Sequence, residues 1–384
     1  MENTSALRSG PLRAGNATGA NSMAAVPSSS DRDIKHCRDE IHQYLLERVP
    51  VFRELAELRD KGWKNPAGDE FFKKQRYKAD NCDDKQARGF FELMKRVGGE
   101  VHGVTGVFNI RTSDRPKRIL DMCMAPGAFL HLAMEHNPGA RARAFSLPVE
   151  KGGHKPFIPS LSVVDTDFID ITMLAADMGV DAIPPMHPDA GEFIPKKLHP
   201  EDAFDLVVCD GNVLRTHPRA AYREKVEPAR LTLTQLVIAL EHMKPGGSML
   251  VLLHKVDSWA SILTLRTFSR FSDVQVFKPT KAHKTRSSFY MVASNIQPHH
   301  EEAVRAVHSW KKMWKAATFG TEEEYYSLSS IFEPGVEEVL EDFGPKLIAL
   351  GTSAWETQAK ALANAPFVRE SQPWSRYHTN ERGI

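Results

Sequence analysis

Residues 118–129 read RILDMCMAPGAF, and this stretch decides how the middle of the chain folds. Its aliphatic start predicts a strand, which small residues connect to a helical stretch over 130–136. Small side chains at Ala125, Gly127 and Ala128 let a backbone come close to a ligand, and the N–H groups that begin a helix face it. The same pattern occurs in proteins without a ligand, so it indicates a binding loop only together with further signals.

Short aliphatic runs alternate with helical stretches from residue 118 to residue 294. This alternation is typical of an α/β fold, a parallel sheet with helices on both faces. The two longest helices between strands are expected at 228–243 and 258–271. Ligands of such folds bind at the carboxyl ends of the strands. The expected strands are Arg118–Cys123, Arg141–Leu147, Leu161–Asp165, Phe204–Cys209, Ser248–His254, Val274–Lys278 and Ser288–Ala293.

Acidic residues follow the third and fourth expected strands, in DTDF at 165–168 and at Asp210. Carboxylates at strand ends accept hydrogen bonds from ribose hydroxyls and amino groups, although aspartate is also a favoured helix N-cap. Both interpretations stay open for Asp167 and Asp170. For Asp210, the strand-like residues before it and the glycine after it favour contact with a ligand.

The fifth expected strand follows the helix-stop sequence KPGG at 244–247. His254, Lys255 and Asp257 lie at the carboxyl end of this strand, so they are expected in the crevice where ligands of such folds bind. A lone lysine after a strand is usually solvated, so Lys255 needs a second argument before it is given a role.

Four sequence blocks in a fixed order supply that argument: ILDMCMAPGAF at 119–129, FDLVVCDG at 204–211, MKPGGSMLVLLHK at 243–255 and KPTKAHKTRSSFYMVAS at 278–294. Together they resemble the FtsJ-like (RrmJ-like) RNA ribose 2′-O-methyltransferases, including fungal proteins with an FtsJ domain. The resemblance implies a Rossmann-like methyltransferase fold with a mostly parallel, seven-stranded sheet. It also implies S-adenosylmethionine as the cofactor and RNA as the substrate.

The resemblance assigns the cofactor site residue by residue. The acid that contacts adenine falls on Asp167, and the acid between cofactor and substrate falls on Asp210. The second strand ends in LPVE at 147–150, without an acid at its tip, so a ribose contact by Glu150 stays open. The cofactor loop, with alanine at 128 where a second glycine is usual, falls on Asp121, Ala125, Pro126, Gly127, Ala128 and Phe129.

Catalysis in the family uses a lysine–aspartate–lysine–glutamate tetrad, in which a lysine of lowered pKa helps to remove the proton of a ribose hydroxyl. The resemblance makes Lys255 the central lysine and Asp210 its partner. Ser288 stands at the glutamate position and cannot carry its charge, and Glu92 stands at the other lysine position. The nearest replacements for that lysine are Lys95, then Lys73 and Lys74.

Two basic runs are candidates for RNA binding. The run at 61–78 mixes basic and aromatic residues able to pair phosphates and stack bases, but it fits a solvated helix with buried aromatics equally well. Arg215 and His217 border the groove in one interpretation and belong to a loop stabilised by Pro218 in the other. The run in the loop before the last strand lies beside the crevice and is expected to contact phosphates through Lys278, Lys281, Lys284 and Arg286.

Composition limits the class of protein. The chain has 384 residues, 41% of them hydrophobic, and a net charge of +1, so attraction to RNA depends on local patches. Four scattered cysteines indicate neither a disulfide framework nor a metal site, so reduced thiols and an intracellular location are expected. The expected location is nuclear or cytoplasmic, because an N-terminal tail with two arginines and several glycines makes a poor mitochondrial presequence. No apolar run is long enough for a membrane span.

The expected organisation is a disordered tail at 1–32, a helical lead-in at 33–89, the methyltransferase domain at 90–297 and a helical extension at 298–384. The main hypothesis is an S-adenosylmethionine-dependent enzyme that methylates RNA at ribose 2′-oxygens. Ser288 and Glu92 keep open the alternative of a catalytically degenerate scaffold that binds the cofactor or RNA. A methyltransferase acting on a protein or a small molecule is a third hypothesis.

Overall fold

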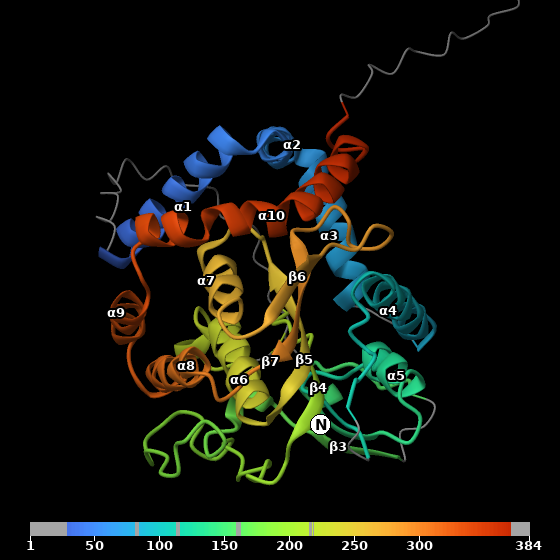
Figure 1. Ribbon diagram of the computed structural model, residues 1–384, viewed down its shortest axis with the longest axis vertical. Helices are drawn as coiled ribbons and strands as arrows, with labels where there is room; N and C mark the ends of the chain where they lie inside the picture. Colours follow the sequence, from blue (N-terminus) through green and yellow to red (C-terminus); the bar gives the residue numbers. More distant parts are fainter. Residues whose placement is uncertain are drawn as a thin grey trace, which may run out of the picture.

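The computed structural model describes residues 29–80, 84–112, 116–158, 163–214, 217 and 219–369. A sheet in the order β3-β2-β1-β4-β5-β7-β6 crosses the molecule (Figure 1). The first five strands in this order are parallel, and β7 runs antiparallel to β5 and β6, so the expected mostly parallel, seven-stranded fold is confirmed. The strands are β1 (Arg118–Asp121), β2 (Arg141–Ser146), β3 (Val164–Phe168), β4 (Phe204–Cys209), β5 (Met243–His254), β6 (Asp273–Phe277) and β7 (Ser288–Ile296).

Successive side chains of a strand point to opposite faces, and this alternation divides the sheet into two apolar faces. On the first face, Leu250 and Tyr290 belong to the core that contains α4 (Asp84–Thr105) and α5 (Ala128–Glu135). On the second face, Met249 and Phe289 belong to the core that contains α6 (Glu227–Glu241) and α7 (Trp259–Phe268). The face to which a side chain points therefore decides which helices it meets.

Helices from both ends of the chain meet on one side of the sheet. Figure 1 shows α1 (Ser29–Arg48) and α2 (Pro50–Lys64) beside α10 (Val336–Ala363), and Phe52 packs edge-on against Trp355 at 5.3 Å. The remaining helices are α3 (Pro66–Asp80), α8 (Glu301–Phe319) and α9 (Glu322–Phe332). Within the described ranges, none of the helices combines the length and apolar character needed to cross a membrane.

Several element boundaries differ from those expected. The expected lead-in at 33–89 contains α1, α2, α3 and the start of α4, and Pro50, which favours a first helical turn, starts α2 directly after α1. The third strand begins at Val164 and includes the polar residues 165–167, and β5 begins at Met243, five residues early. In the expected helical extension, one long helix, α10, spans Val336–Ala363. The predicted tail lies outside the described residues up to residue 28, after which α1 begins.

Candidate active site

A cavity of about 1570 Å³ opens at the carboxyl ends of the strands, between α4 and the start of α5 on one face of the sheet and the start of α6 on the other. Ligand pockets usually measure about 300–1,000 Å³, so this cavity has room for a cofactor together with part of a substrate. Its walls come from the ends of β1, β4, β5 and β7, from α4, and from the loop before β7. This is the location at which the alternating sequence pattern predicts a ligand.

One row of side chains across the sheet forms the floor of the cavity. Val208 of β4 and Leu250 of β5 are paired, and both side chains point to the first face. Two residues further along the chain in each case, Asp210 (directly after β4) and Leu252 line the cavity. Leu252 in turn pairs with Tyr290 of β7. The Tyr290 hydroxyl hydrogen-bonds to Asp210. Asp210 therefore lies in the middle of the floor, as expected.

The floor carries two buried carboxyl groups. Burial raises the pKa of Asp121 to about 7, against a backbone hydrogen bond from Cys123 that lowers it. Burial and the nearby charge of Asp121 raise the pKa of Asp210 to about 8. Among the described residues, Oδ1 of Asp210 is buried without a hydrogen-bond partner. Both groups favour a ligand that brings positive charge or hydrogen-bond donors.

The loop after β1 forms the wall next to this floor. Ala125, Pro126, Ala128 and Phe129 line the cavity, as expected for a cofactor loop. Gly127 does not line it, and it has a backbone φ of +100°, which favours glycine. A Cβ atom at this position would lie 2.3 Å from the Ile158 side chain. Gly127 therefore permits the backbone conformation of the loop and its packing against Ile158, without lining the cavity itself.

Asp167 lies outside the cavity, which corrects its expected contact with adenine. It is inside β3, paired with Phe145, so its side chain points to the second face of the sheet. There its carboxylate lies 2.6 Å from Arg143 and 3.1 Å from Lys197, and the two cations hold its pKa below the usual value against the effect of burial. The acid that reaches the cavity from this strand end is Asp170.

Lys255 does not line the cavity, and its role as the catalytic base stays a prediction from the sequence. It follows β5 by one residue, in the left-handed region with φ of +59°, and does not share the face to which His254 points. Its Nζ lies 3.4 Å from Oδ2 of Asp257, a carboxylate that also accepts two hydrogen bonds from Arg59 of α2, each of 3.1 Å. His254, which was expected in the crevice without an assigned role, does line the cavity.

The other tetrad candidates do not complete the site. Nζ of Lys95 donates to His131 at 2.9 Å and lies 3.4 Å from Glu135, both on α5, so Lys95 joins two helices outside the cavity. Glu92 is exposed on α4. Ser288 does line the cavity, directly across the strand pair from His254. Lys73 and Lys74 are exposed on α3 and do not line it.

The loop before β7 is built around Lys278, which corrects the expected phosphate contact of this residue. Its Nζ donates to the carbonyl oxygens of His283, Arg286 and Ser288, at 2.9, 2.6 and 2.5 Å. Burial, with the charges of Arg59 and Arg286, lowers the pKa of Lys278 to about 7. The remaining predicted phosphate ligands, Lys281, Lys284 and Arg286, are exposed along the rim of the cavity.

Helix α10 holds this loop from outside. Nε2 of Gln358 lies 3.3 Å from the Thr285 carbonyl oxygen and 3.3 Å from Oγ of Ser287. Its Oε1 accepts a hydrogen bond of 2.8 Å from Arg59. Gln358 and Asp257 are buried, at 4% and 5% exposed. The two terminal helical regions thus fix the substrate side of the cavity.

Gln358→Ala is expected to loosen the loop at 281–287. The substitution leaves buried donors and acceptors unpaired, at a cost of about 1–3 kcal/mol. Amide hydrogen exchange of the loop should become faster than in the unchanged chain. Gln43→Ala is the matched control, because Gln43 is exposed and bonds only Glu47 of its own helix. Equal rates of amide hydrogen exchange in the loop of the two variants would contradict the inference that Gln358 holds the loop.

A buried ion network at the end of β3 was not expected from the sequence. Arg223 lies within 3.3 Å of carboxylate oxygens of Asp170, Asp189 and Glu227. Arg230, which is fully buried, donates to Glu227 at 2.6 Å and to the Thr172 carbonyl oxygen at 3.0 Å. The spacing of Arg223 and Glu227 is also that of exposed helix pairs, so the sequence contains no signal of this burial.

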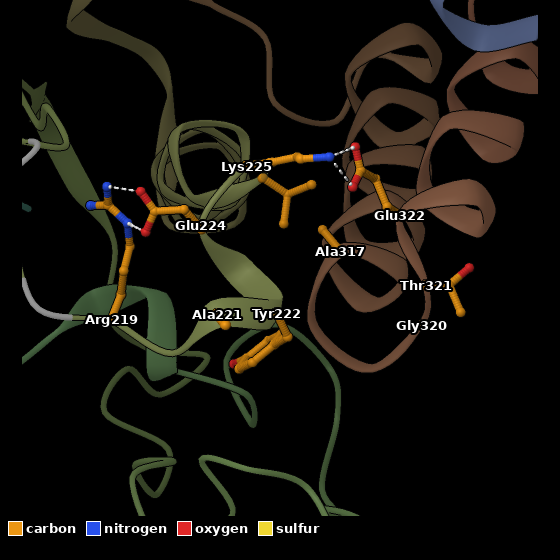
Figure 2. Close-up of a pocket in the computed structure, with 10 residues that line it drawn as sticks. Arg219, Ala221, Tyr222, Glu224, Lys225, Ala317, Gly320, Thr321 and Glu322 are labelled. Carbon is orange, nitrogen blue, oxygen red and sulfur yellow. Dashed lines mark hydrogen bonds and ion pairs between the residues drawn. The ribbon is translucent and has the colours of Figure 1, made fainter. Parts of the chain in front are cut away.

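A smaller cavity of about 530 Å³ lies between the start of α6 and the α8–α9 turn. Figure 2 shows Arg219 turned toward Glu224, and Lys225 turned toward Glu322 across the cavity. The hydroxyl of Tyr222 donates to Asp189. The charged side chains that line this cavity form ion pairs with one another. The buried carboxyl group with an unpartnered oxygen, Asp210, lies in the larger cavity, which is therefore the candidate ligand site.

Of the other candidates, His217 lines the large cavity, and Arg215 lies outside the described residues. In the basic run at 61–78, Phe71 lines the cavity and Trp63 is 85% exposed. No group of three or more histidine, cysteine, aspartate or glutamate side chains suited to a metal ion occurs among the residues for which positions are described.

Comparison with known proteins agrees with this geometry. Residues 102–296 match the sequence model of FtsJ-like methyltransferases, which is 195 of the 384 residues. The chain belongs to the FtsJ-like methyltransferase family. S-adenosylmethionine is the cofactor of this family, as the sequence resemblance implied. No curated protein matched the chain.

Solved structures similar to this FtsJ-like chain include a ribosomal RNA methyltransferase from Plasmodium falciparum, with 16% identity and a TM-score of 0.34 over 53% of this chain and 96% of that one. An rRNA methylase from Streptococcus thermophilus has 12% identity and a TM-score of 0.31 over 51% and 96% of the two chains. Human methyltransferase-like protein 13, in complex with SAH, has 11% identity and a TM-score of 0.30 over 57% and 92%.

The floor of the cavity fits the cofactor of an FtsJ-like methyltransferase. S-adenosylmethionine supplies an electrophilic methyl group on a positively charged sulfonium and also carries an ammonium group. The buried carboxyl groups of Asp121 and Asp210, one with an unpartnered oxygen, provide the opposite charge. The backbone and side chains of 125–129 would hold the rest of the molecule against α5.

Proposed function

We propose that this FtsJ-like methyltransferase transfers a methyl group from S-adenosylmethionine to ribose 2′-hydroxyls of RNA. The observation that carries the proposal is that a single cavity combines an acidic floor with a basic rim. Asp121 and Asp210 form the floor, and Lys281, Lys284 and Arg286 lie along the rim. The floor suits a cationic cofactor, and the rim suits the phosphates of a polyanion.

The test is incubation of the full chain with methyl-labelled S-adenosylmethionine and total RNA. We expect label in RNA, recovered after alkaline hydrolysis in resistant dinucleotides, because a 2′-O-methyl group blocks cleavage at its own position. Label in alkali-sensitive nucleotides would contradict the 2′-oxygen as acceptor. Label confined to protein or to small molecules would contradict RNA as the substrate.

The exposed lysines of the rim give a prediction for RNA affinity. The double variant Lys281→Ala, Lys284→Ala is expected to bind single-stranded RNA more weakly. The slope of log K against log salt concentration should fall by about 1.4, since each lost phosphate contact contributes roughly 0.7. Filter binding at several salt concentrations measures this slope. An unchanged slope would remove these lysines from the RNA interface.

A specific observation favours one other candidate function. Lys95 and Lys255 are turned away from the cavity, and Ser288 replaces the expected glutamate. A catalytically degenerate scaffold that binds the cofactor or RNA would have these features. Tight binding of both ligands by calorimetry, with no label in any fraction, is the result that would favour the scaffold.

A further inference from the structure

A methyl-accepting hydroxyl must lose its proton as the methyl group arrives, and the floor of the cavity needs a group to receive it. Neither predicted lysine is turned toward the floor. Asp210 already accepts a hydrogen bond from Tyr290, and burial keeps its pKa near 8 in the absence of a cationic ligand. A neutral base on the same face of the sheet would serve this role.

His254 is the last residue of β5 and lies two residues beyond Leu252, so both side chains point to the face that carries Asp210. It pairs directly with Ser288 of the antiparallel neighbour β7, as Leu252 pairs with Tyr290. Directly opposed residues have Cβ atoms about 4.5–5.5 Å apart. His254 and Ser288 thus form the next row above the Asp210 floor.

The surroundings of His254 keep its imidazole neutral. The cavity walls desolvate the ring, and the charges of Arg286 and Lys278 oppose its protonation, so its pKa lies below 6.5. His254 nevertheless has solvent-exposed surface and lines the cavity, so a substrate can reach it. Its backbone is fixed, because the His254 carbonyl oxygen accepts hydrogen bonds from the hydroxyls of Ser258 and Ser261.

Other described groups of the cavity are less suited to this task. The three carbonyl contacts of Lys278 occupy its ammonium group. His283 has a pKa of about 4, lowered by burial, Arg286 and Lys278, which makes it a weak base. His154 and His217 also line the cavity, but they lie together beside Gly152 in the loop after β2, a strand that neighbours neither β5 nor β7 in the sheet.

We propose that His254 receives the proton of the methyl-accepting hydroxyl, with Ser288 beside it at the position of the missing glutamate. The hydroxyl oxygen bonds to the methyl carbon, the carbon–sulfur bond breaks with its electron pair left on sulfur, and the hydroxyl proton passes to one imidazole nitrogen and then to water. This inference rests on the proposed function, because it takes an RNA hydroxyl as the acceptor.

The experiment compares His254→Ala with His308→Ala, a matched control exposed on α8. We expect kcat for RNA methylation to fall by about 10²–10⁴-fold in His254→Ala, the usual contribution of general-base catalysis. Cofactor and RNA affinities, measured by calorimetry and filter binding, should stay within about twofold because no charge is lost. Added imidazole should restore part of the rate to His254→Ala and leave the control unchanged.

Lys255→Ala is the competing variant. Loss of kcat there, with His254→Ala fully active, would return the role to the lysine and overturn the inference. A loss in His254→Ala that imidazole does not restore and that follows weaker cofactor binding would also overturn it. A wild-type chain that methylates no RNA would remove the proposed function itself, which distinguishes the two failures.

Discussion

Asp210→Asn is expected to lower methyl transfer by on the order of 10²–10³-fold, the usual effect of removing one preorganised electrostatic group. Asparagine keeps the shape of the side chain and removes the negative charge that the floor offers to a sulfonium or ammonium group. Calorimetry with S-adenosylmethionine should show weaker binding, and the labelling assay should show the loss of rate. Unchanged cofactor affinity in the variant would contradict the place given to Asp210.

The same substitution should stabilise the protein in the absence of cofactor at alkaline pH. The pKa of Asp210 is about 8 in the folded protein, against about 3.9 for an unfolded aspartate. Between these values the unfolded chain ionises while the folded chain keeps its proton, so the free energy of unfolding falls as pH rises from about 4 to about 8. Asparagine does not titrate, and the variant escapes this loss. Its Tm should match the wild type near pH 4 and exceed it at pH 8.

Cofactor affinity should rise with pH, whereas the free energy of unfolding of the cofactor-free protein falls. A cationic ligand favours the ionised forms of Asp121 and Asp210, whose pKa values are about 7 and about 8. Wild-type affinity for S-adenosylmethionine should therefore rise between pH 6 and pH 8. The rise should be shallower in Asp210→Asn, where only Asp121 titrates.

Arg230→Ala is expected to have the largest effect on stability. Arg230 is fully buried, and its guanidinium bonds Glu227, the Thr172 carbonyl oxygen and Thr318. Removing one partner of a buried pair usually costs about 3–5 kcal/mol, because the remaining charge loses its compensation. For a domain of this size, the Tm should fall by roughly 10 °C.

The matched control for this prediction is Arg305→Ala. Arg305 is 63% exposed and pairs with Glu301 and Glu302 on its own helix, so its removal should change the free energy of unfolding by less than about 0.5 kcal/mol. Thermal unfolding of both variants measures the difference. A similar Tm for the two would mean that the surrounding network compensates for Arg230.

The strands were predictable because aliphatic runs reveal their burial. Phe204–Cys209 is fully buried and has the predicted bounds. The third strand was misplaced because its interior residues, 165–167, are polar and not fully buried, which from sequence alone is typical of a loop. The antiparallel direction of β7 was not predicted by the strand pattern, because the direction of a strand depends on connections rather than on the strand itself.

Two placements in the site differ from expectation because of the face of the sheet to which a side chain points. Sequence locates the end of β5 to within a residue, but a difference of one residue decides the face of the sheet, and this separates His254 from Lys255. Asp167 was misassigned for the same reason. Lys278 differs, since nothing in a basic loop reveals that one of its cations is buried among carbonyl groups.

The contacts of Gln358 with the loop before β7 have a consequence during synthesis of the chain. Gln358 follows its partner Ser287 by 71 residues, which a ribosome adds in roughly 4–14 s at about 5–20 residues per second. Throughout that interval the loop has been synthesised, but Gln358, which holds it in the folded protein, has not. In a nascent chain the loop at 281–287 is therefore made several seconds before the residue that holds it.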